Sequence, residues 1–282
     1  MSSTQIALLG VIAGVTIFIG LPVGRIRKIS VSLSTLLNAA SAGVLLFLLI
    51  ETFVHGFEPV EEALAAVTVE SSGTWGEFIV RTVIFFGAFA VGLLSLVAYN
   101  RYLENRRLLA LGPGAAAVQE FGVLRRFHAL SDPKRLSVLI AIGIGVHNLA
   151  EGLVIGQSAA SGQFSLAVLL VVGFALHNAT EGFGIVGPLA GEADRPSWRF
   201  LFTLGVIAGL PTFLGTIIGQ SFVDANLELL FLGLAAGSIL YVVVTLVGVA
   251  IKHGHKEMLY VGLFAGVTLG ALTELVLVAG GL

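Results

Sequence analysis

The hydrophobic positions of this chain fall into long, nearly unbroken stretches rather than into the alternating or amphipathic patterns of a soluble domain. A helix needs about 20 apolar residues to cross the hydrocarbon core of a bilayer. Stretches of that length occupy residues 5–24, 33–56, 78–98, 136–159, 164–188, 200–219, 228–251 and 258–280. Strands and the apolar cores of signal peptides are shorter. The pattern predicts an all-α integral membrane protein, a bundle of eight transmembrane helices.

Composition agrees with that prediction and narrows the function. Hydrophobic residues make up 56% of the 282 residues and charged residues 11%, against about 25% charged residues in a soluble protein. A globule of this size could not cover so much apolar surface. The net charge of −2 gives no basic surface for nucleic acid, and the absence of cysteine excludes thiolate metal sites. We expect one transmembrane domain over residues 1–282, multi-pass in the cell membrane and surrounded by lipid.

Lysine and arginine concentrate in alternate loops, as they do on the cytoplasmic side of membrane proteins. The loops after the first, third, fifth and seventh spans hold all the basic residues except Arg81. These residues are Arg25, Arg27, Lys28, Arg101, Arg106, Arg107, Arg125, Arg126, Lys134, Arg135, Arg195, Arg199, Lys252 and Lys256. We therefore predict that both termini lie outside. Residues 99–135 should form a cytoplasmic loop between the third and fourth helices, with an amphipathic helix near Phe121–Leu130.

The fourth and fifth spans carry the same polar string. The fourth reads His147-Asn148-Leu149-Ala150-Glu151-Gly152, and the fifth reads His177-Asn178-Ala179-Thr180-Glu181-Gly182. A spacing of four residues places each histidine and its glutamate on one helix face. A short turn near residues 161–163 makes the two helices antiparallel neighbours, with each string about 18–22 Å below the surface. The two strings should therefore face each other near the middle of the bilayer.

Ionisable residues at that depth are costly and usually functional. A hydrogen bond between helices would be the simpler explanation for one such residue, but it explains a repeated string poorly. Imidazole, carboxylate and amide groups together suit zinc, iron, manganese, cobalt or cadmium better than magnesium or calcium. We predict a divalent-metal site, and a cation there would also neutralise the carboxylates. Its candidate ligands are His147, Asn148, Glu151, His177, Asn178 and Glu181.

The two His-Asn-x-x-Glu-Gly strings on consecutive spans, within eight spans and after a long third loop, resemble the ZIP (Zrt/Irt-like) family of divalent metal transporters. The resemblance covers the architecture of the whole chain and is motif-specific over residues 136–190. It implies a bundle with pseudo-symmetric repeats, metal movement toward the cytoplasm and a homodimer. It also implies that the six candidate ligands match the family's metal-binding positions.

Other polar positions leave alternatives open. Glu51, His55 and Glu58 share a helical stripe that either relays metal inward or is a solvated helix end. Leu210 and Thr245 stand where members of the family often have glutamate, which favours one main metal over a binuclear centre. Glu274 is either a buried partner of another polar group or an interfacial residue near a helix end, and we expect the latter. The pair His253 and His255 is a weak candidate for catching metal at the exit.

The rival functions are an intramembrane zinc metalloenzyme and a metal-sensing membrane protein that transports nothing. A zinc protease would be expected to carry His-Glu-x-x-His on one helix, which neither string matches. The sequence also lacks a glycine-rich phosphate loop, so ATP-driven pumping is not expected. We predict a transporter rather than an enzyme. No prosthetic group is expected, and Zn²⁺ or another divalent transition metal is the transported substrate.

Overall fold

The computed structural model describes residues 1–26, 30–110, 130–162, 164–189, 194–221, 224–252 and 254–279. Helices make up 90% of these residues, and no strand occurs among them. The helices are α1 (Ser3–Val15), continued by the 3-10 turns η1 (Thr16–Ile19) and η2 (Leu21–Arg25), α2 (Val31–Thr68), α3 (Trp75–Ala110), α5 (Asp132–Ala160), α6 (Phe164–Val186) with the 3-10 turn η3 (Gly187–Leu189), α7 (Trp198–Gly219), α8 (Ala225–Lys252) and α9 (Lys256–Ala279).

Seven stretches among the described residues are long and apolar enough to cross a membrane, the first of them running through α1, η1 and η2. The remaining long helix, α6, has 23 residues and occupies the stretch predicted for the fifth span. The helical class is thereby confirmed, and the chain is a multi-pass helical membrane protein. The amphipathic helix expected near Phe121–Leu130 falls almost wholly outside the described residues.

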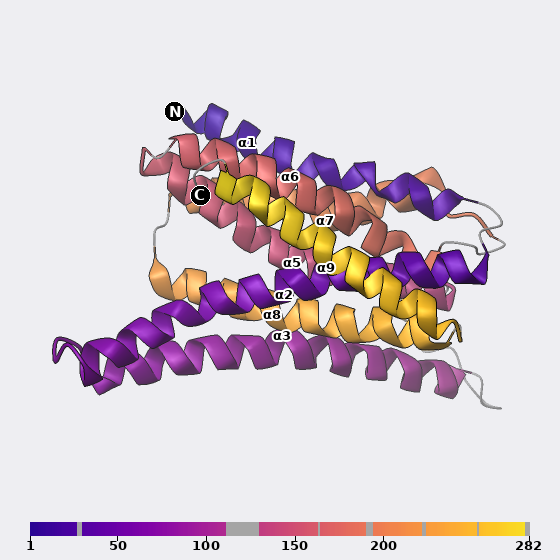
Figure 1. Cartoon of the computed structure of the whole chain (residues 1–282), viewed down its shortest axis with the longest axis horizontal. Coiled ribbons are helices and arrows are strands. Elements are labelled where there is room, and N and C mark those ends of the chain that lie inside the picture. The colour runs from indigo at the N-terminus through magenta and orange to yellow at the C-terminus, as the bar shows by residue number, and fades with distance from the viewer. Residues whose placement is uncertain are drawn as a thin grey trace.

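The second helix is longer than its apolar stretch. We expected a loop over residues 57–77, but α2 continues to Thr68 and α3 begins at Trp75. The extension is rich in glutamate and alanine, which favour helix. Its inner face is also buried, because Val60 packs with Phe85 of α3 and Leu229 of α8. The hairpin of α2 and α3 therefore projects beyond the other helices (Figure 1).

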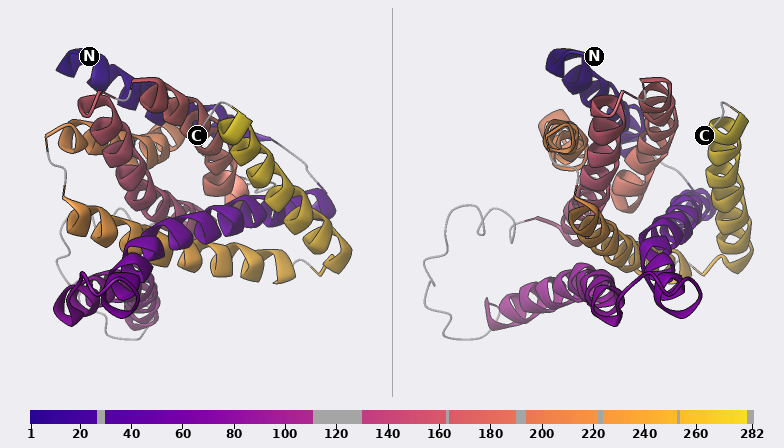
Figure 2. Two further views of the ribbon diagram at one scale, coloured as in Figure 1. Left: turned by 60° about the vertical axis from the view of Figure 1, so that its left-hand side comes forward. Right: turned by 90° about the vertical axis from the view of Figure 1, so that its left-hand side faces the viewer.

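The helices form two groups. In the first, α5 packs against α7, α7 against α1, α1 against α6 and α6 against α5, which closes a ring of four. In the second, α2 contacts α8 and α9, and α8 contacts α3. The two views of Figure 2 show both groups, with α9 lying along one side of α2. Contacts of α5 with α8 and of α6 with α2 and α9 join the groups.

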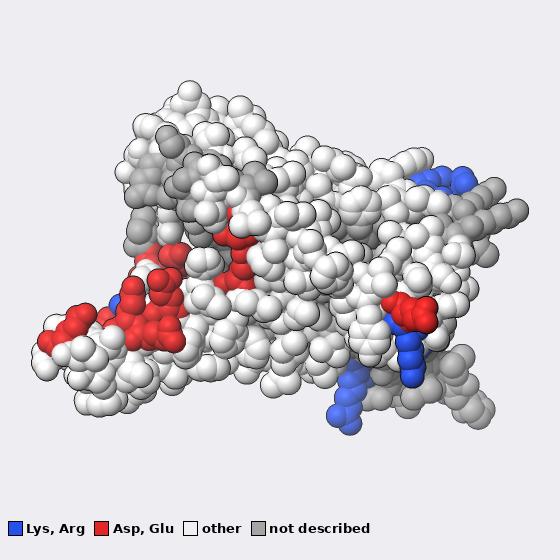
Figure 3. Space-filling view, in the orientation of Figure 1, with Lys and Arg blue, Asp and Glu red and all other residues white. Residues whose placement is uncertain are grey.

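Charge separates the two ends of the bundle (Figure 3). Both termini and the α2–α3 turn lie at one end (Figure 1), which we call the acidic end. Its glutamates include Glu58, Glu61, Glu62, Glu70 and Glu77 of the α2–α3 hairpin and Glu228 at the start of α8. The opposite, basic end holds Arg25, Arg101, Lys252 and Lys256, at the ends of η2, α3 and α8 and the start of α9. The exception, Arg81, pairs with Glu77 at 2.6 Å and donates to the carbonyl of Pro59.

A short internal repeat underlies the contact between α1 and α7. The sequence Leu-Gly-Val-Ile-Ala-Gly occurs at Leu9–Gly14 and again at Leu204–Gly209. The helices run in opposite directions, because α1 leads to the basic end and α7 leads away from it. They meet backbone to backbone: a Cβ added to either Gly14 or Gly209 would collide with the carbonyl oxygen of the other. Two inverted copies of one hexapeptide therefore form this contact.

Candidate metal site

The His, Asn and Glu side chains of both polar strings that the structure describes are buried on α5 and α6. Exposed fractions are 5% for His147, 0% for Asn148, 5% for Glu151, 0% for Asn178 and 1% for Glu181. The turn between the helices is made by Gly162, whose φ of +81° favours glycine. The antiparallel arrangement of α5 and α6 is as expected. The side chain of His177 lies outside the described part of the structure, although its backbone belongs to α6.

The two asparagines are anchored in the same way. Asn148 Nδ2 donates to the carbonyl of Ala208 on α7 at 3.0 Å, and Asn178 Nδ2 donates to the carbonyl of Ala13 on α1 at 3.0 Å. Ala13 and Ala208 are equivalent residues of the repeated hexapeptide. The amide nitrogen of each asparagine is thus used structurally, and the amide oxygen is left as a free ligand.

Most of the nitrogen and oxygen atoms of these buried side chains have no hydrogen-bond partner among the described residues. Such an atom costs free energy when it is buried, so a cluster of them requires an explanation. The unpartnered atoms are His147 Nδ1 and Nε2, Asn148 Oδ1, Glu151 Oε2, Asn178 Oδ1, and Glu181 Oε1 and Oε2. All are acceptors or titratable atoms of the kind that ligate transition metals.

These side chains also interact with one another. His147 Nε2 lies 3.2 Å from Glu151 Oε1, too poorly directed for a hydrogen bond but close enough for an ion pair. Glu181 is near enough to interact electrostatically with His147 and Glu151. Even so, no three His, Asp or Glu side chains within the described set are already placed around a common metal position. The structure places His147, Asn148, Glu151 and Glu181 within reach of one another and buries Asn178 on the same helix as Glu181, and it does not describe the side chain of His177.

Two further carboxylates lie beside this cluster. Glu51 of α2 and Glu274 of α9 are half-buried with their carboxyl groups adjacent, and Glu51 interacts electrostatically with His147 and Glu151. Of the two readings of Glu274, the structure favours the buried partner, since its carboxyl group lies beside that of Glu51. His55 and Glu58, by contrast, are exposed. Of the predicted stripe on α2, only Glu51 reaches the site.

The positions that lack glutamate differ in their surroundings. Leu210 is 46% exposed and cannot serve the site, and the Thr245 hydroxyl donates to the carbonyl of Tyr241 at 2.7 Å. Thr212, which the sequence analysis passed over, is fully buried with an unpartnered hydroxyl. Its usual acceptor, the carbonyl of Ala208, is bound by Asn148. At the basic end, His255 contacts Ser32 at 3.4 Å, and His253 lies outside the described residues.

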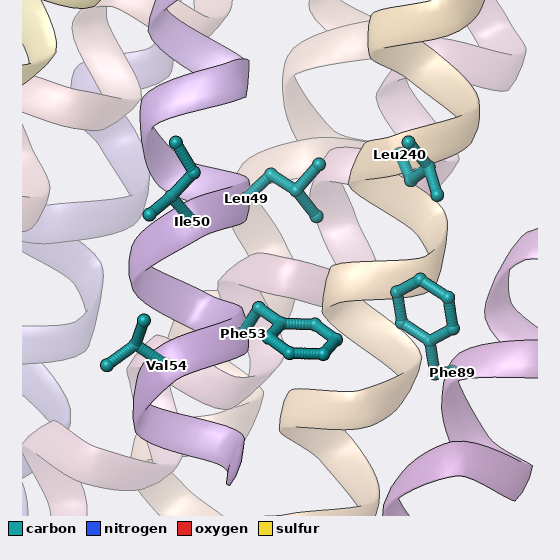
Figure 4. A pocket seen from close by; sticks show the side chains of 6 residues that line it. All are labelled: Leu49, Ile50, Phe53, Val54, Phe89 and Leu240. Atoms are coloured by element: carbon teal, nitrogen blue, oxygen red, sulfur yellow. The ribbon is translucent and has the colours of Figure 1, made fainter. Parts of the chain in front are cut away.

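Two pockets on the bundle are apolar and separate from the cluster. One of about 260 Å³ opens between α2, α3 and α8 (Figure 4). Its lining is Leu49, Ile50, Phe53, Val54, Phe89 and Leu240. Another of about 510 Å³ is formed by η1, η2 and α7, and includes Phe18, Trp198 and Phe202. Neither offers the donor atoms that a metal requires, and both suit acyl chains of surrounding lipid.

Fold and site together define a multi-pass helical membrane protein with a buried cluster of imidazole, amide and carboxylate groups on two antiparallel helices. Comparison of the sequence with models of protein families and with curated proteins finds no match.

Proposed function

We propose that this protein is a transporter of divalent transition-metal cations, with zinc as the leading candidate, and that metal moves toward the cytoplasm through a site on α5 and α6. His147, Asn148, Glu151, His177, Asn178 and Glu181 are its ligands. The observation that carries the proposal is the set of unpartnered nitrogen and oxygen atoms buried between these helices. The resemblance to ZIP transporters points the same way.

A cation accounts for this set better than protein contacts do. Two carboxylates in a low-dielectric interior repel each other and lose their hydration. One divalent ion restores both the charge balance and the missing coordination. The fixed amide nitrogens of Asn148 and Asn178 leave their oxygens as acceptors, so the asparagines complement a cation and not an anion.

The direction of transport follows from the charged ends. Basic residues favour the cytoplasmic side, so the basic end faces the cytoplasm and the acidic end faces outward. Glutamates at the acidic end would attract cations electrostatically. Glu51 and Glu274, half-buried between that end and the site, are suitably placed to receive them.

Transport is tested by Zn²⁺ flux into liposomes containing the purified protein. We expect saturable uptake that is lost in the double variant Glu151→Gln with Glu181→Gln. Glu228→Gln is the matched control, because this residue is a partly buried glutamate at the start of α8. Uptake that persists in the double variant would refute the site. Peptide hydrolysis without flux would instead favour the metalloenzyme.

Orientation can be measured independently of transport. The chain has no cysteine, so a single introduced cysteine gives an unambiguous labelling site. In intact cells, Ser72→Cys at the α2–α3 turn should react with a membrane-impermeant maleimide, whereas Lys256→Cys at the start of α9 should be protected. The reverse pattern would overturn the inferred direction. Competition among Zn²⁺, Fe²⁺, Mn²⁺, Co²⁺ and Cd²⁺ then identifies the preferred cargo, allowing for the general preference of such sites for zinc.

A further inference from the structure

A third buried asparagine shares the bonding pattern of the two proposed ligands. Asn38 of α2 is fully buried, and its Nδ2 donates to the carbonyl of Ser34 at 2.9 Å. Its Oδ1 has no partner among the described residues. An amide oxygen left unpaired in the interior of a membrane protein costs free energy, so this atom requires a partner that the described residues do not supply.

Asn38 lies between the candidate metal site and the basic end. Glu181, Gly184 and Gly187 follow one face of α6 and η3, and buried polar residues of α2 lie against that face. A Cβ on Gly184 would be 3.5 Å from the Cβ of Ser41, and one on Gly187 would be 2.7 Å from Asn38 Oδ1. At 1.5 Å per residue, Gly187 is about 9 Å beyond Glu181 along the helix axis. The amide oxygen is therefore a short step from the last carboxylate of the site.

A second unpartnered polar group lies at this depth. Ser137 of α5 is fully buried, and its hydroxyl has no described partner. Ser137 and Gly187 are separated from the turn at Gly162 by the same number of residues, so they lie at the same depth in the antiparallel pair of helices. The contact between α5 and η3 agrees with this placement. The nearby cation Arg135 is neutralised by Asp132 at 3.1 Å.

We propose that Asn38 Oδ1 is a ligand of a second divalent-cation subsite, on the basic-end side of the His147–Glu151–Glu181 cluster, with the Ser137 hydroxyl as a further donor at the same depth. The cation keeps part of its water shell there. The direction of travel through this subsite rests on the proposed transport function, but binding at the subsite does not.

The chemistry of the subsite suits a place of passage. Amide and hydroxyl oxygens are neutral, so they hold a divalent ion more weakly than the carboxylates of the main site. An ion in transit must bind well enough to enter a position and weakly enough to leave it. A subsite with neutral ligands next to the carboxylate site lowers the barrier for the ion to leave the carboxylates, and it does not bind the ion tightly enough to trap it.

The test combines equilibrium Co²⁺ binding in detergent with Zn²⁺ flux in liposomes. Asn38→Leu should lower flux by about tenfold, the effect of losing one polar ligand contact, while Co²⁺ affinity at the main site stays unchanged and reports correct folding. Asn38→Asp should add a second bound Co²⁺ per chain and slow its release. Thr35→Val is the matched control, because Thr35 is equally buried on α2 but its hydroxyl is satisfied by the carbonyl of Val31 at 2.9 Å.

The outcomes separate this inference from the proposed function. Wild-type flux in Asn38→Leu, or a single Co²⁺ in Asn38→Asp, would overturn the subsite while leaving transport intact. If the wild-type protein moves no Zn²⁺, the transport proposal fails, and the Co²⁺ stoichiometry of Asn38→Asp still decides whether the subsite exists. Loss of main-site binding in Asn38→Leu together with a single Co²⁺ in Asn38→Asp would assign Asn38 a packing role only.

Discussion

The two arms of the candidate site, α5 with α7 and α6 with α1, carry the same string and the same anchor but differ in the described contacts around their glutamates. On α5, Glu151 is paired with His147 at 3.2 Å. On α6, the equivalent histidine, His177, has a side chain that the structure does not describe, and Glu181 interacts electrostatically with His147 and Glu151 of the other arm. The neighbours differ too, since Gly152 packs against Thr212 and Gly182 against Ile17. The repeated sequences give both arms the same asparagine anchor, whereas the residues around each glutamate determine how much free energy its burial costs.

The largest effect should come from separating the arms at their shared contact. Gly209→Leu would place a side chain where the backbones of α1 and α7 touch, and it would displace the carbonyls that anchor Asn148 and Asn178. We expect a loss of about 3 kcal/mol or more in stability, from overpacking a tight contact, and loss of metal binding. Thermal unfolding in detergent measures the loss of stability. Gly87→Leu is the control, because no atom lies within 4 Å of a Cβ added at that residue; equal damage there would contradict the explanation.

The next effect distinguishes the carboxylates. Glu181→Gln should raise the melting temperature of the metal-free protein, because removing a fully buried carboxylate relieves about 2 kcal/mol of desolvation, while metal no longer stabilises the variant. Glu151→Gln should stabilise less, because Glu151 already interacts with His147. Melting curves with and without Zn²⁺ provide both values. A destabilised metal-free Glu181→Gln would contradict this explanation, because it would mean that His147 or another group already balances the charge without metal.

The asparagines should respond equally. Asn148→Leu and Asn178→Leu each remove one anchor to an equivalent alanine carbonyl and one proposed ligand oxygen. We expect each to weaken Zn²⁺ binding by about tenfold, the loss of one coordinating contact. Equilibrium dialysis compares them directly. A large difference between the two would show that the hexapeptide repeat does not make the arms equivalent.

The smallest effect concerns two threonines of α7. Thr212→Val removes an unpartnered buried hydroxyl and should stabilise the metal-free protein by about 1 kcal/mol. Thr216→Val removes a hydroxyl that donates to the carbonyl of Thr212 at 2.8 Å, so it should destabilise by about 1 kcal/mol. Opposite shifts in melting temperature are the expected result, and shifts of the same sign would argue against the hydrogen-bond assignment.

The spans were predictable because hydropathy depends on single residues and their neighbours in sequence. Each predicted apolar stretch lies largely within a helix of the structure. The end of α2 was not predictable in this way, because its polar extension is stabilised by the packing of Val60 against α3 and α8. Which helices pair was also hidden: α2 with α9 and α3 with α8 meet through close backbone contacts at small residues, such as Gly43 and Gly92.

At the site, the repeated string was readable because all its members lie on two consecutive helices. Glu274, Thr212 and Asn38 were missed or misassigned because each reaches the polar interior from another helix, and a single polar residue in an apolar stretch looks the same whether its atoms are satisfied or not. The one signal that was present and overlooked is the repeated Leu-Gly-Val-Ile-Ala-Gly, which marks the two helices that hold the asparagines.

The contact between Gly14 and Gly209 has a dimensional consequence. The carbonyl of the residue just before each glycine accepts a hydrogen bond from one of the two asparagines. The spacing of these two anchoring carbonyls is therefore set by the contact between the main chains of α1 and α7, a length that thermal motion changes little.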